Sequence, residues 1–154
     1  MKTLEQRFFE KVKKTDTCWE WTAYRDECGY GRFKVDGVTR PAHRVSYQMK
    51  NGPIGDGLLI DHICHNPPCV NPDHLRSVTQ KQNLEHQVSA MRTSKTGVRG
   101  VFYYPSRGNY VGSVRHQKKL HHVGYFATIA EAEAAVIAKR NELFTHNDAD
   151  RKTV

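Results

Sequence analysis

The chain has 154 residues, 38% of them hydrophobic, and its 24 Lys and Arg outnumber 16 Asp and Glu, for a formal net charge of +8. That length suits one domain, or two small ones that need a stabilising device such as a structural metal. The charge points to a polyanionic partner, and no apolar run approaches the roughly 18 residues that span a bilayer. We therefore expect no membrane association.

The first residues lack the apolar core of a signal peptide. We therefore expect a reducing compartment: the cytoplasm of a bacterial or phage-infected cell, or the nucleus of a eukaryote. Four cysteines in such a compartment favour metal ligation over disulfides.

Hydrophobic periodicity and turn signals divide the first 57 residues into short elements. Apolar side chains recur at helical spacing near the start, and large apolar and polar side chains then alternate as in a half-buried strand. Asp36-Gly37 is a pair favoured in two-residue hairpin turns, and Pro41 suits the first position of a helix. The expected elements are a helix at 4–13, strands at 18–22, 29–35 and 38–40, a helix at 41–50 and a loop at 51–57.

Residues 58–62 read as a short buried strand that ends at His62. The following segment is rich in Asn and Pro, so it lacks the hydrogen bonds of a β-ladder. Thr79-x-x-Gln82 matches a capping box and predicts a helix that includes Leu84 and Val88. Residues 89–97 are polar and end this pattern.

Three side chains that bind metals lie within this irregular loop: Cys64, Cys69 and His74. Structural zinc takes four ligands in a tetrahedron, so the fourth must come from elsewhere. Cys18 is the candidate because it lies at the start of a strand, whereas Cys28, in a glycine-flanked turn, reads as a small buried hydrophobe. Zinc would supply the constraint that the loop lacks, and three unrelated residues are the alternative interpretation.

His62 and Asn83 flank the loop with groups suited to phosphodiester hydrolysis. A neutral imidazole can take a proton from water, and an amide oxygen on the first turn of a helix is a hard ligand for magnesium. One such ion neutralises charge on the scissile phosphate and on the leaving 3′ oxygen. Asp61 can supply another oxygen or orient a histidine. A lone His-Asp pair would read as a core contact, but the zinc loop would fix the strand beside the helix, which favours catalysis.

Five motifs lie in residues 15–90: Cys18-Trp19-x-Trp21-Thr22, Gly29-Tyr30-Gly31, Ala42-His43-Arg44, Asp61-His62-x-Cys64 and Cys69-Val70-Asn71-Pro72-x-His74-Leu75. Together with Asn83, they resemble the HNH endonucleases, and most closely the His-Cys box homing endonucleases and related phage HNH proteins. The resemblance implies the ββα-metal fold, with zinc on Cys18, Cys64, Cys69 and His74. It also implies His62 as general base, Asn83 as ligand to one catalytic magnesium, and Arg44 as a contact to the scissile or a neighbouring phosphate. Larger members carry a second zinc site whose cysteines are absent here, so monomer and homodimer both stay open.

The residues after 97 change character. Three strand-like segments are followed by Thr128-x-x-Glu131, a second capping box, and by an alanine-rich helix whose axis can lie close to a sheet. The expected elements are strands at 98–104, 109–115 and 120–125 and a helix from 128 to about 144. We expect the polar tail after residue 144 to be frayed.

The distribution of charge singles out the same region. No Asp or Glu occurs between Glu85 and Glu131, whereas Lys and Arg do: Arg92, Lys95, Arg99, Arg107, Arg115, Lys118 and Lys119. A solvated surface normally mixes the two signs, so we expect a nucleic-acid-binding face here, with a merely basic surface as the alternative.

Gly97-Val98-Arg99-Gly100-Val101, Tyr110, Val123-Gly124-Tyr125-Phe126 and the alanine-rich helix resemble the APETALA/ethylene-response-factor DNA-binding domain. The resemblance implies three antiparallel strands in the major groove of double-stranded DNA. It implies contacts from Arg99, Tyr104, Ser113, Arg115 and His122, with Lys118 and Lys119 near phosphates, and we include Arg107 in the same set.

We therefore predict an α+β protein: a zinc-stabilised nuclease domain at 1–90, a linker at 91–97, a DNA-binding domain with a three-stranded sheet and one helix at 98–146, and a polar tail at 147–154. The competing hypothesis is a non-enzymatic DNA-binding protein whose zinc loop is purely structural. A third, an RNA-binding or RNA-cleaving protein, would prefer single strands. His62 with Asn83 favours the enzyme, because a structural loop needs neither.

Overall fold

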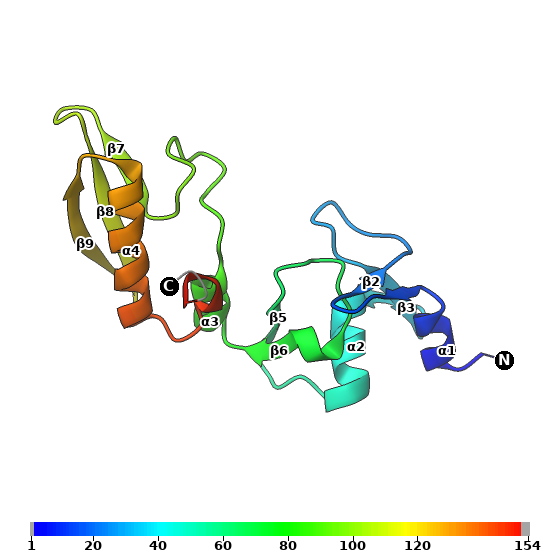
Figure 1. Ribbon diagram of the computed structural model, residues 1–154. Coiled ribbons are helices and arrows are strands. Elements are labelled where there is room, and N and C mark those ends of the chain that lie inside the picture. The colour runs from blue at the N-terminus through cyan, green and yellow to red at the C-terminus, as the bar shows by residue number, and fades with distance from the viewer. Residues whose placement is uncertain (1, 152–154) are drawn as a thin grey trace. The chain divides into compact units, whose positions relative to one another are not determined.

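The computed structural model describes residues 2–151 and contains two compact units, residues 1–80 and 81–154 (Figure 1). Helices and small antiparallel sheets occur in both units, so the expected mixture of α and β structure is confirmed. Within residues 2–151, no helix is long and apolar enough to cross a membrane. The predicted domain boundaries, with a linker at 91–97, stay predictions.

The first unit consists of short elements. Its three sheets are two-stranded and antiparallel, and β3 and β4 are joined at Asp36-Gly37 as predicted. The predicted helix 4–13 is wrong at its end, because it stops at Phe9 and Val12 begins a strand. The elements are α1 Leu4–Phe9, β1 Val12–Lys14, β2 Trp19–Trp21, β3 Arg32–Val35, β4 Val38–Pro41, α2 Ala42–Asn51, β5 Leu59–His62, the 3-10 helix η1 Pro72–His74 and β6 Leu75–Val78.

An aromatic cluster forms the core of this unit. Phe8, Trp21 and Phe33 are buried, and their ring centroids lie 5.1 to 5.7 Å apart. Gly31 is needed beside them, because a Cβ atom there would stand 2.6 Å from the Trp21 ring. Two-stranded sheets are marginal on their own, so the core and the loops must supply much of the stability.

The second unit is a three-stranded sheet covered by a helix. Strand β8 pairs with β7 on one side and with β9 on the other. The elements are α3 Gln80–His86, β7 Val101–Tyr104, β8 Asn109–His116, β9 Lys119–Phe126, α4 Ile129–Leu143 and α5 Asp148–Arg151. Three expectations are corrected: β7 begins at residue 101 rather than 98, Val88 lies beyond the end of α3, and residues 148–151 form a helix, held by Arg140–Asp150, instead of a frayed tail.

Helix α4 lies against one face of this sheet (Figure 1). Its predicted capping box is confirmed, since the Thr128 hydroxyl accepts from the Glu131 amide and the Glu131 carboxylate accepts from the Thr128 amide. Small side chains on the helix permit close packing onto a hydrophobic core: Val101, Val114, Ala132, Val136 and Phe144 are buried together.

Candidate functional site

A hairpin of β5 and β6 carries the irregular loop of the first unit. His62 pairs with Leu75 at its base, so residues 63–74 project from the two strands. The loop also pairs with strand β2. The Val70 amide donates to the Trp19 carbonyl at 2.7 Å, and the Trp21 amide donates to the Pro68 carbonyl at 2.9 Å. This pairing brings Cys18, which directly precedes β2, to the loop cysteines.

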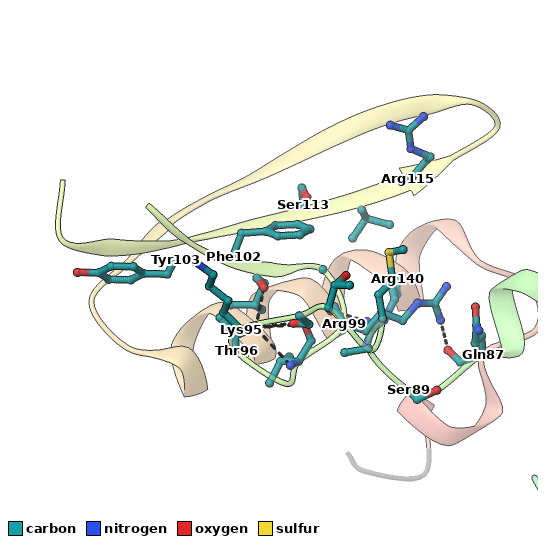
Figure 2. Close-up of a pocket in the computed structure, with 18 of the residues that line it drawn as sticks. Gln87, Ser89, Lys95, Thr96, Arg99, Phe102, Tyr103, Ser113, Arg115 and Arg140 are labelled. Atoms are coloured by element: carbon teal, nitrogen blue, oxygen red, sulfur yellow. Dashed lines mark hydrogen bonds between the residues drawn. The ribbon is translucent and has the colours of Figure 1, made fainter. Parts of the chain in front are cut away.

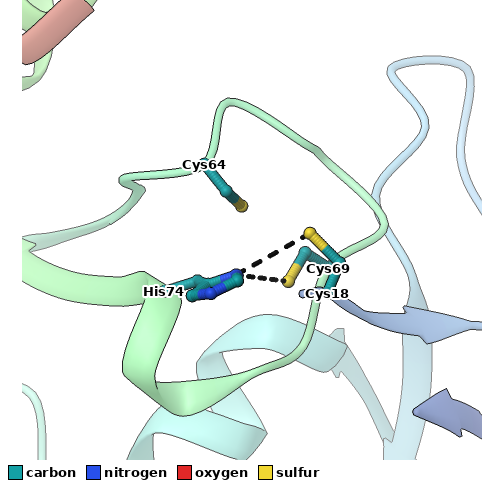
Figure 3. A group of neighbouring side chains, drawn as sticks. All are labelled: Cys18, Cys64, Cys69 and His74. Carbon is teal, nitrogen blue, oxygen red and sulfur yellow. Dashed lines mark hydrogen bonds between the residues drawn. The ribbon is translucent and has the colours of Figure 1, made fainter. Parts of the chain in front are cut away.

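Cys18, Cys64, Cys69 and His74 gather into one cluster, as predicted (Figure 3). Their ligand atoms all lie within 4.8 Å of one another. Cys28 is exposed and stands outside the cluster, so its expected burial is wrong. The reason is local, because the turn that carries Cys28 is held at the surface by the Asp26 carboxylate, which accepts from the Cys28 amide at 3.0 Å.

The cluster has the dimensions of a tetrahedral metal site. The Nδ1 atom of His74 lies 3.7 Å from the Cys18 sulfur and 3.6 Å from the Cys69 sulfur. Zinc bonds of about 2.3 Å to sulfur and about 2.0 Å to nitrogen place such ligands roughly 3.5 Å apart. Burial raises the pKa of Cys64, and it raises that of Cys69 to about 12. By its residue types and spacing, this Cys3His set could hold a metal such as zinc, which would also stabilise the thiolate form of the cysteines.

Asn71 and Ser46 support this cluster and were not among the predicted residues. The buried Asn71 side chain donates to the Thr17 carbonyl at 3.3 Å and accepts from the Asp73 amide at 3.1 Å, which ties the residue before Cys18 to the turn before His74. The Ser46 hydroxyl donates to the Val70 carbonyl and ties α2 to the same loop. The Asn-Pro-Asp sequence at 71–73 is typical of a turn and could have identified Asn71 as a supporting residue. Nothing in the sequence around Ser46 indicates its contact with the loop.

His62 stands at the end of β5, 7% exposed, with its Nε2 atom 2.9 Å from the carbonyl oxygen of Cys69. Two rings pack around it: the His43 centroid lies at 4.9 Å and the Tyr30 centroid at 5.7 Å. Burial lowers the pKa of His62, and it lowers that of His43 to about 3. Both imidazoles are therefore neutral near pH 7. His43 and Tyr30 belong to the quoted motifs, but the sequence did not place them against His62.

Two further predicted residues lie in the first unit. Asp61 directly precedes His62 in the chain, and Arg44 lies in α2. The carboxylate of Asp61 is buried and accepts from Arg76 Nε at 2.9 Å, across the β5–β6 pair in which these two residues are register partners. Arg44 is half-buried in the first turn of α2 beside His43. Asn83 is half-buried in α3 and belongs to the second unit.

The outer face of the second unit's sheet gathers most of the predicted DNA-binding residues. The strand register places Ser113 opposite His122, and the alternation of side chains puts Arg115 on the same face. Arg107 lies 4.7 Å from the Tyr125 ring centroid and 6.0 Å from that of Tyr104. Lys118 and Lys119 are exposed at the β8–β9 turn. This outer face is Tyr104, Arg107, Ser113, Arg115, His122 and Tyr125.

Arg99 behaves differently from the other predicted DNA-binding residues. Together with Ser113 and Arg115, it lines a mostly apolar cavity of 770 Å³ between the sheet and the segment 87–96, but its guanidinium points to the Gln87 carbonyl (Figure 2). It also donates to the carbonyls of Leu84 at 2.9 Å and Glu85 at 3.2 Å. Its donors are therefore engaged inside the unit.

The segment that contains the loop is similar to a known protein family. Residues 40–85 match the HNH endonuclease family. The matched segment contains Arg44, Asp61, His62 and Asn83, together with three of the four clustered metal ligands. An HNH domain indicates a nuclease-type function, and such a function implies a nucleic-acid substrate.

Three curated relatives come from bacteriophages. Protein 7.7 of Escherichia phage T7 is 40% identical over 80 residues, which cover 52% of this chain and 62% of the relative. Protein 2.8 of the same phage is 36% identical over 95 residues, covering 60% and 65%. The uncharacterized gene 5.3 protein of Enterobacteria phage T3 is 34% identical over 67 residues, covering 39% and 65%. The chain thus spans just under two thirds of each relative. No solved structure matches it significantly.

Proposed function

We propose that this protein is an HNH endonuclease of the homing type, which hydrolyses phosphodiester bonds in double-stranded DNA. The observation that carries the proposal is the hydrogen bond between His62 Nε2 and the Cys69 carbonyl, inside the segment that matches the HNH family. It joins the proposed base to the loop that the four metal ligands shape.

The bond sets the tautomer of His62. A carbonyl oxygen can only accept, so Nε2 carries the ring proton and Nδ1 is the accepting nitrogen of the neutral ring. In the proposed reaction, Nδ1 takes a proton from water while the water oxygen bonds to phosphorus. The bond between phosphorus and the 3′ oxygen breaks, and that oxygen is protonated by solvent. The products are a 5′-phosphate and a 3′-hydroxyl.

An amide oxygen suits a hard cation. In this proposal the Asn83 amide oxygen would be a ligand of one magnesium, as the resemblance to the ββα-metal proteins implies. When bound, magnesium neutralises charge on the scissile phosphate and on the leaving oxygen. Arg44 donates to a neighbouring phosphate oxygen and so orients the strand that is cut.

The two units divide the remaining work in this proposal. Zinc on Cys18, Cys64, Cys69 and His74 holds the loop, because a loop without a β-ladder has little else to fix it. The outer face of the second unit, which resembles an APETALA/ethylene-response-factor domain, binds the duplex. The phage relatives favour the cytoplasm of an infected bacterium as the site of action.

The direct test is to incubate the zinc-loaded protein with supercoiled plasmid and phage genomic DNA, with magnesium or with EDTA, and to map the ends. We expect cleavage at preferred positions only with magnesium, leaving 5′-phosphate ends. Intact plasmid, with the protein still bound to duplex DNA, would instead make this a non-catalytic zinc-stabilised DNA-binding protein. Cleavage confined to single-stranded RNA would overturn the proposed substrate.

A further inference from the structure

Helix α3, which carries Asn83, ends in carbonyl groups that are bound by a single side chain. Arg99 donates to the carbonyl oxygens of Leu84, Glu85 and Gln87. The last carbonyls of a helix have no partner within the helix, and a cation at that end is also favoured by the helix dipole. Arg99 therefore caps α3 from a position 12 to 15 residues further along the chain.

The Glu85 side chain connects the same turn of α3 to the rest of the second unit. It is 4% exposed, and its Oε2 atom accepts from both the backbone amide, at 2.9 Å, and the hydroxyl, at 3.0 Å, of Thr145. Its Oε1 atom lies 2.6 Å from Lys81 Nζ and 3.5 Å from His116 Nε2. His116 belongs to strand β8 and Thr145 follows α4, so α3 is tied to both layers of the second unit.

Arg99 is itself held in place. Its guanidinium lies 5.6 Å from the Phe144 ring centroid, and its backbone carbonyl accepts from Arg140 Nη1 at 3.0 Å. Arg140 is buried and forms a two-pronged ion pair with Asp150, at 2.7 and 2.9 Å. Figure 2 labels three of these residues, Arg99, Gln87 and Arg140, whose side chains lie close together.

We propose that Arg99 and Glu85 are positioning residues that lock helix α3, and with it Asn83, onto the DNA-binding sheet. The proposal rests on the proposed function, in which Asn83 is a metal ligand. It adds that the oxygen donor for magnesium and the surface that binds DNA belong to one rigid unit. Binding of the duplex by the sheet therefore determines where Asn83 stands.

The length of α3 makes such a lock necessary. A helix of seven residues is far too short to be stable alone in water. Asn83 directly precedes Leu84, the first residue whose carbonyl Arg99 binds. Loss of the cap would fray the helix from its C-terminal end, and Asn83 would lose its fixed position before the sheet lost its fold.

The first test follows α3 without any metal. Hydrogen–deuterium exchange is measured on the peptide covering 80–88 in the full-length wild type, Arg99→Ala, Arg99→Lys and, as a matched control, Arg107→Ala. A hydrogen bond to a charged group contributes enough that its loss should speed exchange by about tenfold in Arg99→Ala, with Arg99→Lys in between. Arg107→Ala should exchange as the wild type does. Unchanged exchange in Arg99→Ala would overturn the proposal.

The second test uses the magnesium dependence of cleavage. Arg99→Ala should need about tenfold more magnesium for half-maximal cleavage and recover at saturating magnesium, while its affinity for duplex DNA stays within about twofold. Retained affinity also shows that the sheet is folded. Weakened DNA binding with an unchanged magnesium requirement would make Arg99 a DNA contact and overturn the lock. If the wild type cleaves nothing, the proposed function fails, and the exchange measurement still decides whether Arg99 holds α3.

Discussion

The two units are stabilised in different ways, although they are of similar length. The first has three two-stranded sheets around an aromatic core, and its loop converges on three thiols and an imidazole. The second has one continuous sheet and a fifteen-residue helix over a core of mostly valine and alanine side chains with Phe144. Among residues 2–151, a cluster of His, Cys, Asp or Glu side chains that could hold a metal occurs in the first unit alone. Small domains with short strands and little core are often held by a structural metal, whereas a three-stranded sheet covered by a helix can be stable without one.

The two units also differ in net charge. Residues 1–80 carry twelve Lys and Arg against ten Asp and Glu, whereas residues 81–154 carry twelve against six. Most of the net positive charge thus belongs to the unit with the exposed aromatic and basic sheet face. The proposed general base would then belong to the first unit, whereas DNA affinity, together with the proposed magnesium ligand Asn83, would belong to the basic one.

Removal of Cys69, a proposed zinc ligand, should have the largest effect, and the effect should be confined to the first unit. Structural zinc sites bind with roughly 10–16 kcal/mol of apparent free energy, so Cys69→Ser should destabilise the first unit by at least about 5 kcal/mol. Both tryptophans, Trp19 and Trp21, lie in this unit, so tryptophan fluorescence reports its unfolding selectively. Elemental analysis should show about one zinc per chain in the wild type and in the control Cys28→Ser. If the wild type without zinc unfolds at the same midpoint as the zinc-loaded wild type, the metal does not stabilise the first unit.

Truncation of His62 should remove chemistry without removing binding. Loss of a general base costs about 10²–10⁴-fold in rate, so His62→Ala should reduce single-turnover cleavage by that factor. Its affinity for duplex DNA should stay within about threefold, measured by fluorescence anisotropy with magnesium replaced by calcium. Cleavage that survives at near wild-type rate would exclude His62 as the base.

Truncation of Arg115 should do the opposite. A base or phosphate contact is worth about 1–3 kcal/mol, so Arg115→Ala should weaken duplex binding by roughly tenfold or more. The cleavage rate at saturating DNA should be unchanged within about threefold. Lys139→Ala provides the control, because Lys139 lies on α4 and pairs with Glu142. Equal affinities of Arg115→Ala and the wild type would show that the sheet does not bind DNA.

The smallest effect concerns the pH dependence of the second unit's stability. Burial raises the pKa of Glu85, but bonds from Lys81 and Thr145 outweigh it, so the net pKa is lowered. A lowered pKa means that the carboxylate stabilises the fold fully above the usual glutamate pKa of about 4.3, and that this stability is lost as pH falls through the folded value.

Glu85→Gln should therefore cost about 1–2 kcal/mol at pH 7, and the difference from the wild type should shrink below about pH 4. Far-UV circular dichroism during urea unfolding measures it, with tryptophan fluorescence as the control for the first unit. A difference that is independent of pH would mean that the ionised carboxylate is not the stabilising group.

The sequence predicted the features that depend on neighbouring residues. The spacing of Cys64, Cys69 and His74 predicted three members of the Cys3His cluster, and the start of a strand predicted Cys18 as the fourth. Asp36-Gly37 and Thr128-x-x-Glu131 gave a hairpin and a helix start, because turns and caps are set by local hydrogen bonds.

Features that depend on distant residues were missed. The contacts of Arg99 with the end of α3, the packing of His43 and Tyr30 on His62 and the ion pair that holds the helix at 148–151 all join residues at least 10 positions apart. No local pattern encodes them. The strand at Val12 was read as helix because a single apolar turn fits both periods.

The central claim, that the two units carry separable tasks, is tested most directly by a double-mutant cycle with His62→Ala and Arg115→Ala. Binding and single-turnover cleavage are measured on the wild type, both single variants and the double variant with one DNA substrate. Sites without shared partners give changes that add within about 0.5 kcal/mol. We predict that the double variant binds as Arg115→Ala does and cleaves bound DNA as His62→Ala does. A coupling energy above about 1 kcal/mol in either measurement would contradict the division of tasks.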